Sequence, residues 1–268
     1  MKVALIQINS NENINENFNK FTSFLKEASE NNSELVVFPE NTFFIGSMKE
    51  NNNVAKKIKE LFLDKIIKEI KKYKIDVIIG GIPYLYDDNN KPFNRLFYID
   101  KNGIILKTYD KIHLFKLDNS DSISNEPSFV KSGKEIVTLK NDNFIFGFSI
   151  CYDLRFPELY RKLIDKGSNV LFVPAAFTFK TGSLHWEVLL RARAIENQAY
   201  VLAPNQVGFH GKNGKFGHSY GKTSFVTPKG EITSLDTQKE GVLYCEIEKE
   251  KIDEFRSFLP ALENRVIR

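Results

Sequence analysis

The chain has 268 residues, 42% of them hydrophobic and 27% charged, which is enough to build one large α/β domain around a sizeable core. Its net charge of +4 is small and its lysines are spread along the chain, so the sequence predicts no nucleic-acid groove. No apolar stretch is long enough to predict a membrane span, and two cysteines without a signal-peptide pattern predict a reducing, cytoplasmic location.

The N-terminal part of the chain alternates apolar runs with stretches of helical spacing. Strands are expected over 3–8, 35–38 and 76–80, and helices over 17–30 and 54–73. The strands at 35–38 and 76–80 are apolar nearly throughout instead of alternating with polar residues. Such strands are typical of sheets covered on both faces, which requires a layered sandwich.

The rest of the chain contains two hairpin signals and further helix–strand units. The expected hairpins pair 95–100 with 104–108 and 136–139 with 144–149. Helices are then expected over 157–166, 185–198 and 249–258, and strands over 170–174, 200–203, 223–226 and 242–247. No linker rich in Pro, Gly or Ser divides these elements. The sequence therefore predicts a single α/β domain over residues 1–268 with mixed sheets.

Two of the expected strands are followed closely by a charged residue. Glu40 can be a helix cap or a surface group, whereas apolar walls would raise its pKa and suit it to act as a general base. Lys111 can be a solvated charge, but its apolar neighbours favour a desolvated ammonium that stabilises an oxyanion. His113, close by, is expected to be hydrogen-bonded inside the fold rather than to act as a base.

A cysteine follows a third strand. Cys151 lies where the strand over 144–149 ends and shortly before a helix begins, a turn that exposes a side chain beside free backbone N–H groups. A thiol there can be a nucleophile, although a buried structural cysteine is the common alternative. Cys245 lies inside a strand pattern and is expected to be structural. Together, the three strand ends supply a base, a cation and a thiol.

The segments around these residues resemble the three signature motifs of the nitrilase (carbon–nitrogen hydrolase) superfamily. Phe38-Pro39-Glu40 matches its base motif, residues 109–115 its lysine motif and residues 151–158 its nucleophile motif. The resemblance implies a catalytic triad of Glu40, Lys111 and Cys151, and a four-layer α-β-β-α sandwich. It also implies a second catalytic glutamate between the lysine and cysteine motifs, which orients the substrate or Lys111, and Glu126 is at the corresponding place.

The activity implied by the resemblance is amide hydrolysis through a cysteine thioester. Lys111 and the backbone N–H of Tyr152 are then expected to hold the oxyanion. Arg155 and Thr178 are expected near the substrate, where Arg155 either pairs with a substrate carboxylate or forms a salt bridge with Glu158 or Asp153. No metal or other cofactor is expected, because the four histidines show no ligand spacing.

Residues 177–198 are similar to the branch of the superfamily that cleaves amides of small carboxylic acids. This implies deaminated glutathione or an omega-amide of a keto acid as substrate, with release of ammonia. The chain departs from that branch at Gly221-Lys222-Thr223, where Gly-His-Ser is usual, and carries Gly217-His218-Ser219 four residues earlier. The roles of His218 and of the loop 208–220 therefore stay open.

The resemblance also implies a homodimer or a larger homo-oligomer. The helix over 185–198 is apolar nearly all round and yet charged, which fits either a subunit interface or an internal core helix. Two other functions remain in view. One is an N-carbamoyl amine or amino-acid amidohydrolase of the same superfamily. The other is a catalytically silent binding module on the same fold, against which the intact triad argues.

Overall fold

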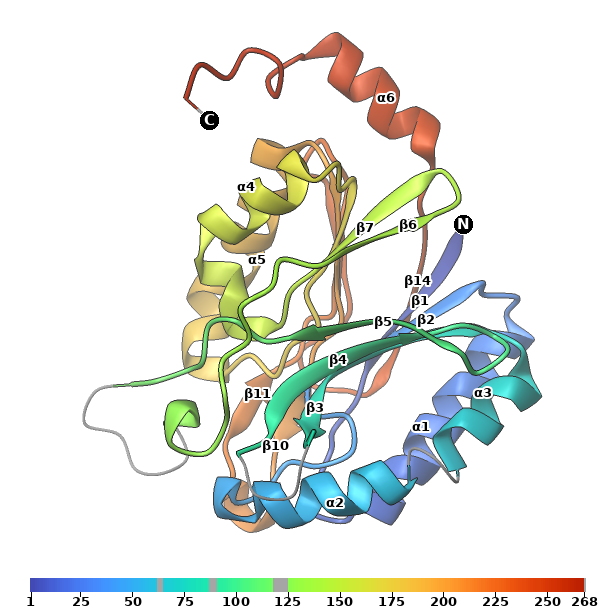
Figure 1. The fold of residues 1–268 in the computed structure, drawn as a ribbon, viewed down its shortest axis with the longest axis vertical. Coiled ribbons are helices and arrows are strands. Elements are labelled where there is room, and N and C mark those ends of the chain that lie inside the picture. The colour runs from blue at the N-terminus through green and yellow to red at the C-terminus, as the bar shows by residue number, and fades with distance from the viewer. Residues whose placement is uncertain (62–64, 87–90, 118–124, 268) are drawn as a thin grey trace.

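Two mixed β-sheets form the centre of the molecule (Figure 1). The computed structural model describes residues 1–61, 65–86, 91–117 and 125–267. One sheet has the strand order β14-β1-β2-β3-β4-β5, and the other has the order β13-β12-β9-β8-β7-β6. Three consecutive strands of each sheet, β1-β2-β3 and β7-β8-β9, are parallel, and the remaining pairs are antiparallel.

The first sheet consists of β1 (Lys2–Gln7), β2 (Leu35–Phe38), β3 (Asp76–Tyr84), β4 (Phe93–Ile99), β5 (Ile105–Asp110) and β14 (Gly241–Glu246). The second consists of β6 (Thr138–Asn141), β7 (Phe144–Phe148), β8 (Val170–Phe172), β9 (Tyr200–Ala203), β12 (Ser224–Val226) and β13 (Ile232–Ser234). A separate hairpin pairs β10 (Val207–Phe209) with β11 (His218–Tyr220).

Helices cover the outer face of each sheet (Figure 1). The first sheet is covered by α1 (Ile14–Glu30), α2 (Asn51–Leu61) and α3 (Ile67–Tyr73). The second is covered by α4 (Pro157–Asp165) and α5 (Phe179–Asn197), while α6 (Lys249–Phe258) continues towards the C-terminus. The predicted α-β-β-α sandwich is thereby confirmed. None of the helices that the structure describes is both long and apolar enough to span a bilayer.

The apolar strands are explained by their position between two layers. Because side chains alternate across a strand, Val3 and Leu5 of β1 join the core between the sheets, whereas Ala4 and Ile6 join the core beneath the helices. All four are fully buried. A strand with two covered faces has no solvent side that would favour polar residues, so it reads as an unbroken apolar run.

Most predicted elements are confirmed, with shifted ends. The helix expected over 54–73 corresponds to α2 and α3, and residues 62–64 lie outside the described part of the chain. Helix α1 begins at Ile14 instead of residue 17 because the side chain of Asn13 accepts hydrogen bonds from the first-turn N–H groups and caps it.

Helix α5 begins six residues earlier than expected. Gly182 and the polar residues around it are poor helix formers, which hid this first segment. A Cβ on Gly182 would lie 2.5 Å from Cβ of Tyr220, so glycine is needed where the helix meets β11. The strands β10, β11 and β13 were missed, because their three residues show neither a period of two nor the unbroken apolar run that marks the equally short β8.

Candidate active site

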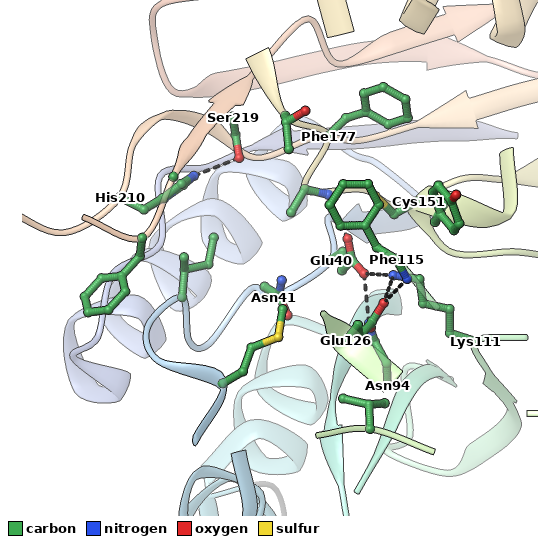
Figure 2. Close-up of a pocket in the computed structure, with 18 of the residues that line it drawn as sticks. Glu40, Asn41, Asn94, Lys111, Phe115, Glu126, Cys151, Phe177, His210 and Ser219 are labelled. Atoms are coloured by element: carbon green, nitrogen blue, oxygen red, sulfur yellow. Dashed lines mark hydrogen bonds and ion pairs between the residues drawn. The ribbon is translucent and has the colours of Figure 1, made fainter. Parts of the chain in front are cut away.

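Three strand ends meet at one cavity of about 260 Å³ (Figure 2). Glu40 follows β2 and Lys111 follows β5, both in the first sheet, while Cys151 follows β7 of the second sheet. All three line the cavity, and so does Glu126, which begins the short 3-10 helix Glu126–Ser128. The structure thus brings together the four residues that the sequence selected for chemistry.

The carboxylates of Glu40 and Glu126 flank the ammonium group of Lys111. Lys111 Nζ lies 2.8 Å from Oε1 of Glu40 and 2.9 Å from Oε2 of Glu126, and all three side chains are buried. Within the described residues, no group of three or more His, Cys, Asp or Glu side chains is placed to hold a metal ion. Two carboxylates against one ammonium leave this cluster with one net negative charge beside the thiol of Cys151.

The pKa of Glu40 is lowered, whereas apolar walls would have raised it. Burial raises it, but the charge of Lys111 and hydrogen bonds from Lys111, Cys151 and Asn94 outweigh burial and lower it. The second oxygen, Oε2, accepts a hydrogen bond from the backbone N–H of Ala176 at 3.0 Å. Apolar walls would have raised this pKa, but the strand end meets hydrogen-bond donors and a cation instead.

The cluster keeps the thiol protonated and the amine charged. Burial raises the pKa of Cys151 well above its usual value, and the nearby carboxylate of Glu40 raises it further. Burial lowers the pKa of Lys111, but the charges of Glu126 and Glu40 outweigh this and hold it well above its usual value. The resting site therefore contains a thiol rather than a thiolate, next to a carboxylate that can take its proton.

The backbone of Cys151 adopts an unusual conformation. Its φ is 48°, in the left-handed region that few non-glycine residues occupy, and its N–H donates to the carbonyl of Pro174 at 2.9 Å. Such strain is often stored at functional sites. The residue opens the 3-10 helix Cys151–Arg155, whose first N–H groups have no partner within the helix itself.

Asp153 ties the lysine segment to the cysteine segment. Its Oδ1 accepts hydrogen bonds from N and Nδ1 of His113 at 2.9 and 2.7 Å. Its Oδ2 accepts from the hydroxyl of Tyr109 at 2.7 Å and from the N–H of Ile150 at 2.9 Å. His113 is thus hydrogen-bonded within the fold as expected, and this fully buried carboxylate links the residues around Lys111 to the turn at Cys151.

The three predicted substrate residues, Tyr152, Arg155 and Thr178, all line the cavity. The guanidinium of Arg155 lies 5.0 Å over the ring of Phe177, and its NH1 is 3.2 Å from Nδ1 of His185. No salt bridge from Arg155 to Glu158 or Asp153 is found among the described residues. The oxygens of Asp153 are taken by other donors, so Arg155 is left facing the cavity.

Asn94 is a residue of the site that its sequence pattern did not predict. Its Nδ2 donates to Oε1 of Glu40 at 2.8 Å and to Oε1 of Glu126 at 3.0 Å. The next residue, Arg95, pairs with Asp110 through two contacts of 2.7 Å, directly opposite it in the β4–β5 register. The signal in the sequence that could have identified Asn94 was the polar pair Asn94-Arg95 at the start of one hairpin strand. It faces the charged pair Asp110-Lys111 at the end of the other strand.

Comparison with known proteins gives matches along the chain. The family model for carbon–nitrogen hydrolases matches residues 2–257. Deaminated glutathione amidase of Synechocystis sp. (strain PCC 6803) is 37% identical over 270 residues, which cover 98% of this chain and 97% of that protein. Omega-amidase of Homo sapiens is 30% identical over 266 residues, which cover 98% and 94%.

Two solved structures are similar over nearly the whole chain. The NitFhit protein of Caenorhabditis elegans superposes with a TM-score of 0.89 at 32% identity, over 99% of this chain and 65% of that longer protein. Saccharomyces cerevisiae Nit3, a member of branch 10 of the nitrilase superfamily, superposes with a TM-score of 0.86 at 28% identity, over 100% and 97%.

Proposed function

Because this chain belongs to the carbon–nitrogen hydrolase family, we propose that it cleaves an amide of a small carboxylic acid through a thioester on Cys151. As an amidase of the nitrilase superfamily, it is a hydrolase that acts on carbon–nitrogen bonds other than peptide bonds. The observation that carries the mechanism is the buried contact of Lys111 with two carboxylates in the cavity that Cys151 also lines.

The first half of the reaction transfers the acyl group to sulfur. Glu40 takes the thiol proton as Cys151 Sγ attacks the carbonyl carbon, and the carbonyl π electrons move to oxygen. Lys111 and the backbone N–H of Tyr152 stabilise this oxyanion. When the tetrahedral intermediate collapses, the C–N bond breaks and the leaving amine takes the proton held by Glu40. Ammonia leaves from a primary amide and an amine from a secondary amide.

The second half releases the acid. Glu40 takes a proton from water as the water oxygen attacks the thioester carbonyl, and the C–S bond then breaks with return of a proton to sulfur. The lowered pKa of Glu40 keeps its carboxylate ionised at neutral pH, which is the form that a general base needs. Glu126 holds the Lys111 ammonium in place through its 2.9 Å contact and offsets its charge.

The substrate end of the proposal rests on Arg155 and Thr178. Arg155 offers the cavity a positive charge, and Thr178 Oγ1 lies 2.9 Å from the hydroxyl of Thr181, which also lines the cavity. A small acid with a free carboxylate fits this combination, since guanidinium binds carboxylate through two parallel hydrogen bonds. The relatives named for deaminated glutathione and for omega-amides support the same substrate class.

The test is an amide screen on the purified protein. Deaminated glutathione, 2-oxoglutaramate and N-carbamoyl amines are incubated with wild type and with Cys151→Ala, and acid, amine or ammonia is measured. Hydrolysis of one of the first two, lost in Cys151→Ala, is expected. Activity confined to the N-carbamoyl compounds would show that the substrate is an N-carbamoyl amine and not an amide of a small carboxylic acid. Activity that survives Cys151→Ala would refute the thioester mechanism.

Three further properties are proposals of the same kind. We propose one domain over residues 1–268, a cytoplasmic location and a homo-oligomer. Helix α5 exposes Leu184, Val188 and Ile195 to 72%, 67% and 45%, and these residues follow one another on one side of the helix. We therefore place the subunit interface at these three exposed side chains, while the opposite side of α5 belongs to the core. Size-exclusion chromatography with light scattering tests the oligomer.

A further inference from the structure

The hairpin of β10 and β11, within residues 207–220, forms a wall of the cavity that has no part in the mechanism above. Its lining residues are His210, Phe216, Gly217, His218 and Ser219. Figure 2 shows His210 and Ser219 hydrogen-bonded to each other and set apart from the group of Glu40, Lys111 and Glu126. This wall therefore faces a part of the substrate that lies away from the reacting carbonyl.

The tautomer of His210 follows from its partners. Nδ1 lies 2.9 Å from the carbonyl oxygen of Ser10, which can only accept, so Nδ1 carries a proton. Nε2 lies 2.8 Å from Oγ of Ser219. Burial lowers the pKa of His210, so the ring is neutral at pH 7 and Nε2 has a free lone pair. The hydroxyl of Ser219 consequently donates its proton to Nε2.

This orientation makes Ser219 an acceptor towards the cavity. With its only proton committed to His210, Oγ of Ser219 offers the cavity lone pairs alone. Ser219 is 4% exposed and lines the cavity, so its hydroxyl is shielded from bulk solvent. A substrate N–H placed there gains a hydrogen bond, whereas a carboxylate oxygen meets lone pairs. Ser219 thus distinguishes donors from acceptors at this point of the wall.

The acceptor is held in place relative to the proposed base. The strand of Ser219 is paired with β10 on one side and bridged to Thr178 on the other. Ser10, which orients His210, donates its N–H to Oε1 of Gln206 at 3.0 Å, and Nε2 of Gln206 donates to the carbonyl of Glu40 at 3.0 Å. A buried chain of hydrogen bonds therefore fixes how far the acceptor lies from the reacting centre.

We propose that Ser219, oriented by His210, is a specificity residue that accepts a hydrogen bond from a substrate N–H remote from the scissile amide. The inference rests on the proposed amidase function and narrows its substrate class. It favours amides of small carboxylic acids whose remote part contains a further, peptide-like N–H. Deaminated glutathione belongs to this class, whereas 2-oxoglutaramate has no such group.

The test compares two ligands that differ by one donor. One is deaminated glutathione, and the other is its depsipeptide analogue, in which ester oxygen replaces the N–H between the cysteine and glycine residues. Calorimetry gives the Kd of each for the Cys151→Ala protein, so the comparison needs no turnover. Tighter binding of the N–H compound by about tenfold is expected, the size of one hydrogen bond. Adding Ser219→Ala brings the ratio to about one, whereas adding Ser183→Ala, an exposed serine of α5 outside the cavity, preserves it.

Two results would overturn the subsite. One is equal binding of the two compounds by the Cys151→Ala protein, which needs no change at Ser219 and is therefore independent of how that variant folds. The other is a preference that survives Ser219→Ala. Failure of the proposed function looks different, because then no amide is hydrolysed by the wild type while the ratio of Kd values still decides the subsite.

Discussion

The substitution Asp153→Asn tests whether the link between the lysine and cysteine segments positions the site. The fully buried carboxylate accepts from four donors, and two of these are the backbone N–H groups of Ile150 and His113, one on each oxygen. An asparagine NH₂ must replace one oxygen. The hydroxyl of Tyr109 and the ring of His113 can turn or change tautomer, but a backbone N–H cannot become an acceptor.

The magnitude follows from this mismatch. At least one buried backbone N–H is left facing a donor, at a cost of about 1–3 kcal/mol, and the remaining bonds lose the strength that the charge gave them. We expect the free energy of unfolding to fall by about 2–4 kcal/mol. Relaxed geometry between Lys111 and Cys151 should lower kcat by about a hundredfold, the effect of a displacement near 1 Å.

The assay combines urea unfolding, followed by circular dichroism, with steady-state hydrolysis of the best amide from the screen. Asp165→Asn is the matched control, because Asp165 is 44% exposed and pairs with Arg265 at the surface, where a salt bridge contributes little. If Asp153→Asn unfolds like Asp165→Asn and keeps the wild-type kcat, Asp153 does not position Lys111 and Cys151.

Three shorter predictions concern Glu40 and helix α5. Glu40→Gln removes a charge that raises the pKa of Cys151, so the pH midpoint of Cys151 alkylation, followed by peptide mass spectrometry, should fall. The same change should lower kcat by about 10² or more. An unchanged midpoint would contradict the influence of Glu40 on the thiol. The folded pKa of Glu40 lies below its ordinary value of 4.5, so its ionisation stabilises the fold above that pH; this contribution should disappear as the pH falls through the lower folded pKa, and wild type and Glu40→Gln should then converge in acid unfolding titrations. Gly182→Ala should cost about 1–3 kcal/mol in thermal or urea unfolding, because the new Cβ would lie 2.5 Å from Tyr220, whereas Ser183→Ala beside it should be neutral.

The elements with strong local patterns were predictable from the sequence. The runs 35–38 and 200–203 and the helix 249–258 have the bounds that their periodicity indicates. Double-sided burial makes a strand apolar throughout, and a helix face repeats every three to four residues, so both leave a signal in a short window. The strands β10, β11 and β13 carry neither of these patterns, and their pairing depends on partners elsewhere in the chain.

The candidate site divides in the same way. The sequence by itself determined the chemistry on offer, namely a carboxylate, an ammonium and a thiol at three strand ends, with Glu126 as a fourth group. Their motifs are local, and no contact is needed to recognise them. Only the tertiary structure decided that Asn94 bridges Glu40 and Glu126, and that Asp153 joins two motifs from different strands.

The pKa of Glu40 shows why the sequence alone does not determine the charge states of the site. Burial and neighbouring charge act on a carboxylate in opposite directions, and the sequence does not say which is stronger. The fold places Lys111 at 2.8 Å and adds donors from Asn94 and Ala176, so neighbouring charge wins. The sequence alone determines the residue types and the order of the motifs. The distances between them, which set the charge states of the site, exist only once the two sheets have packed together.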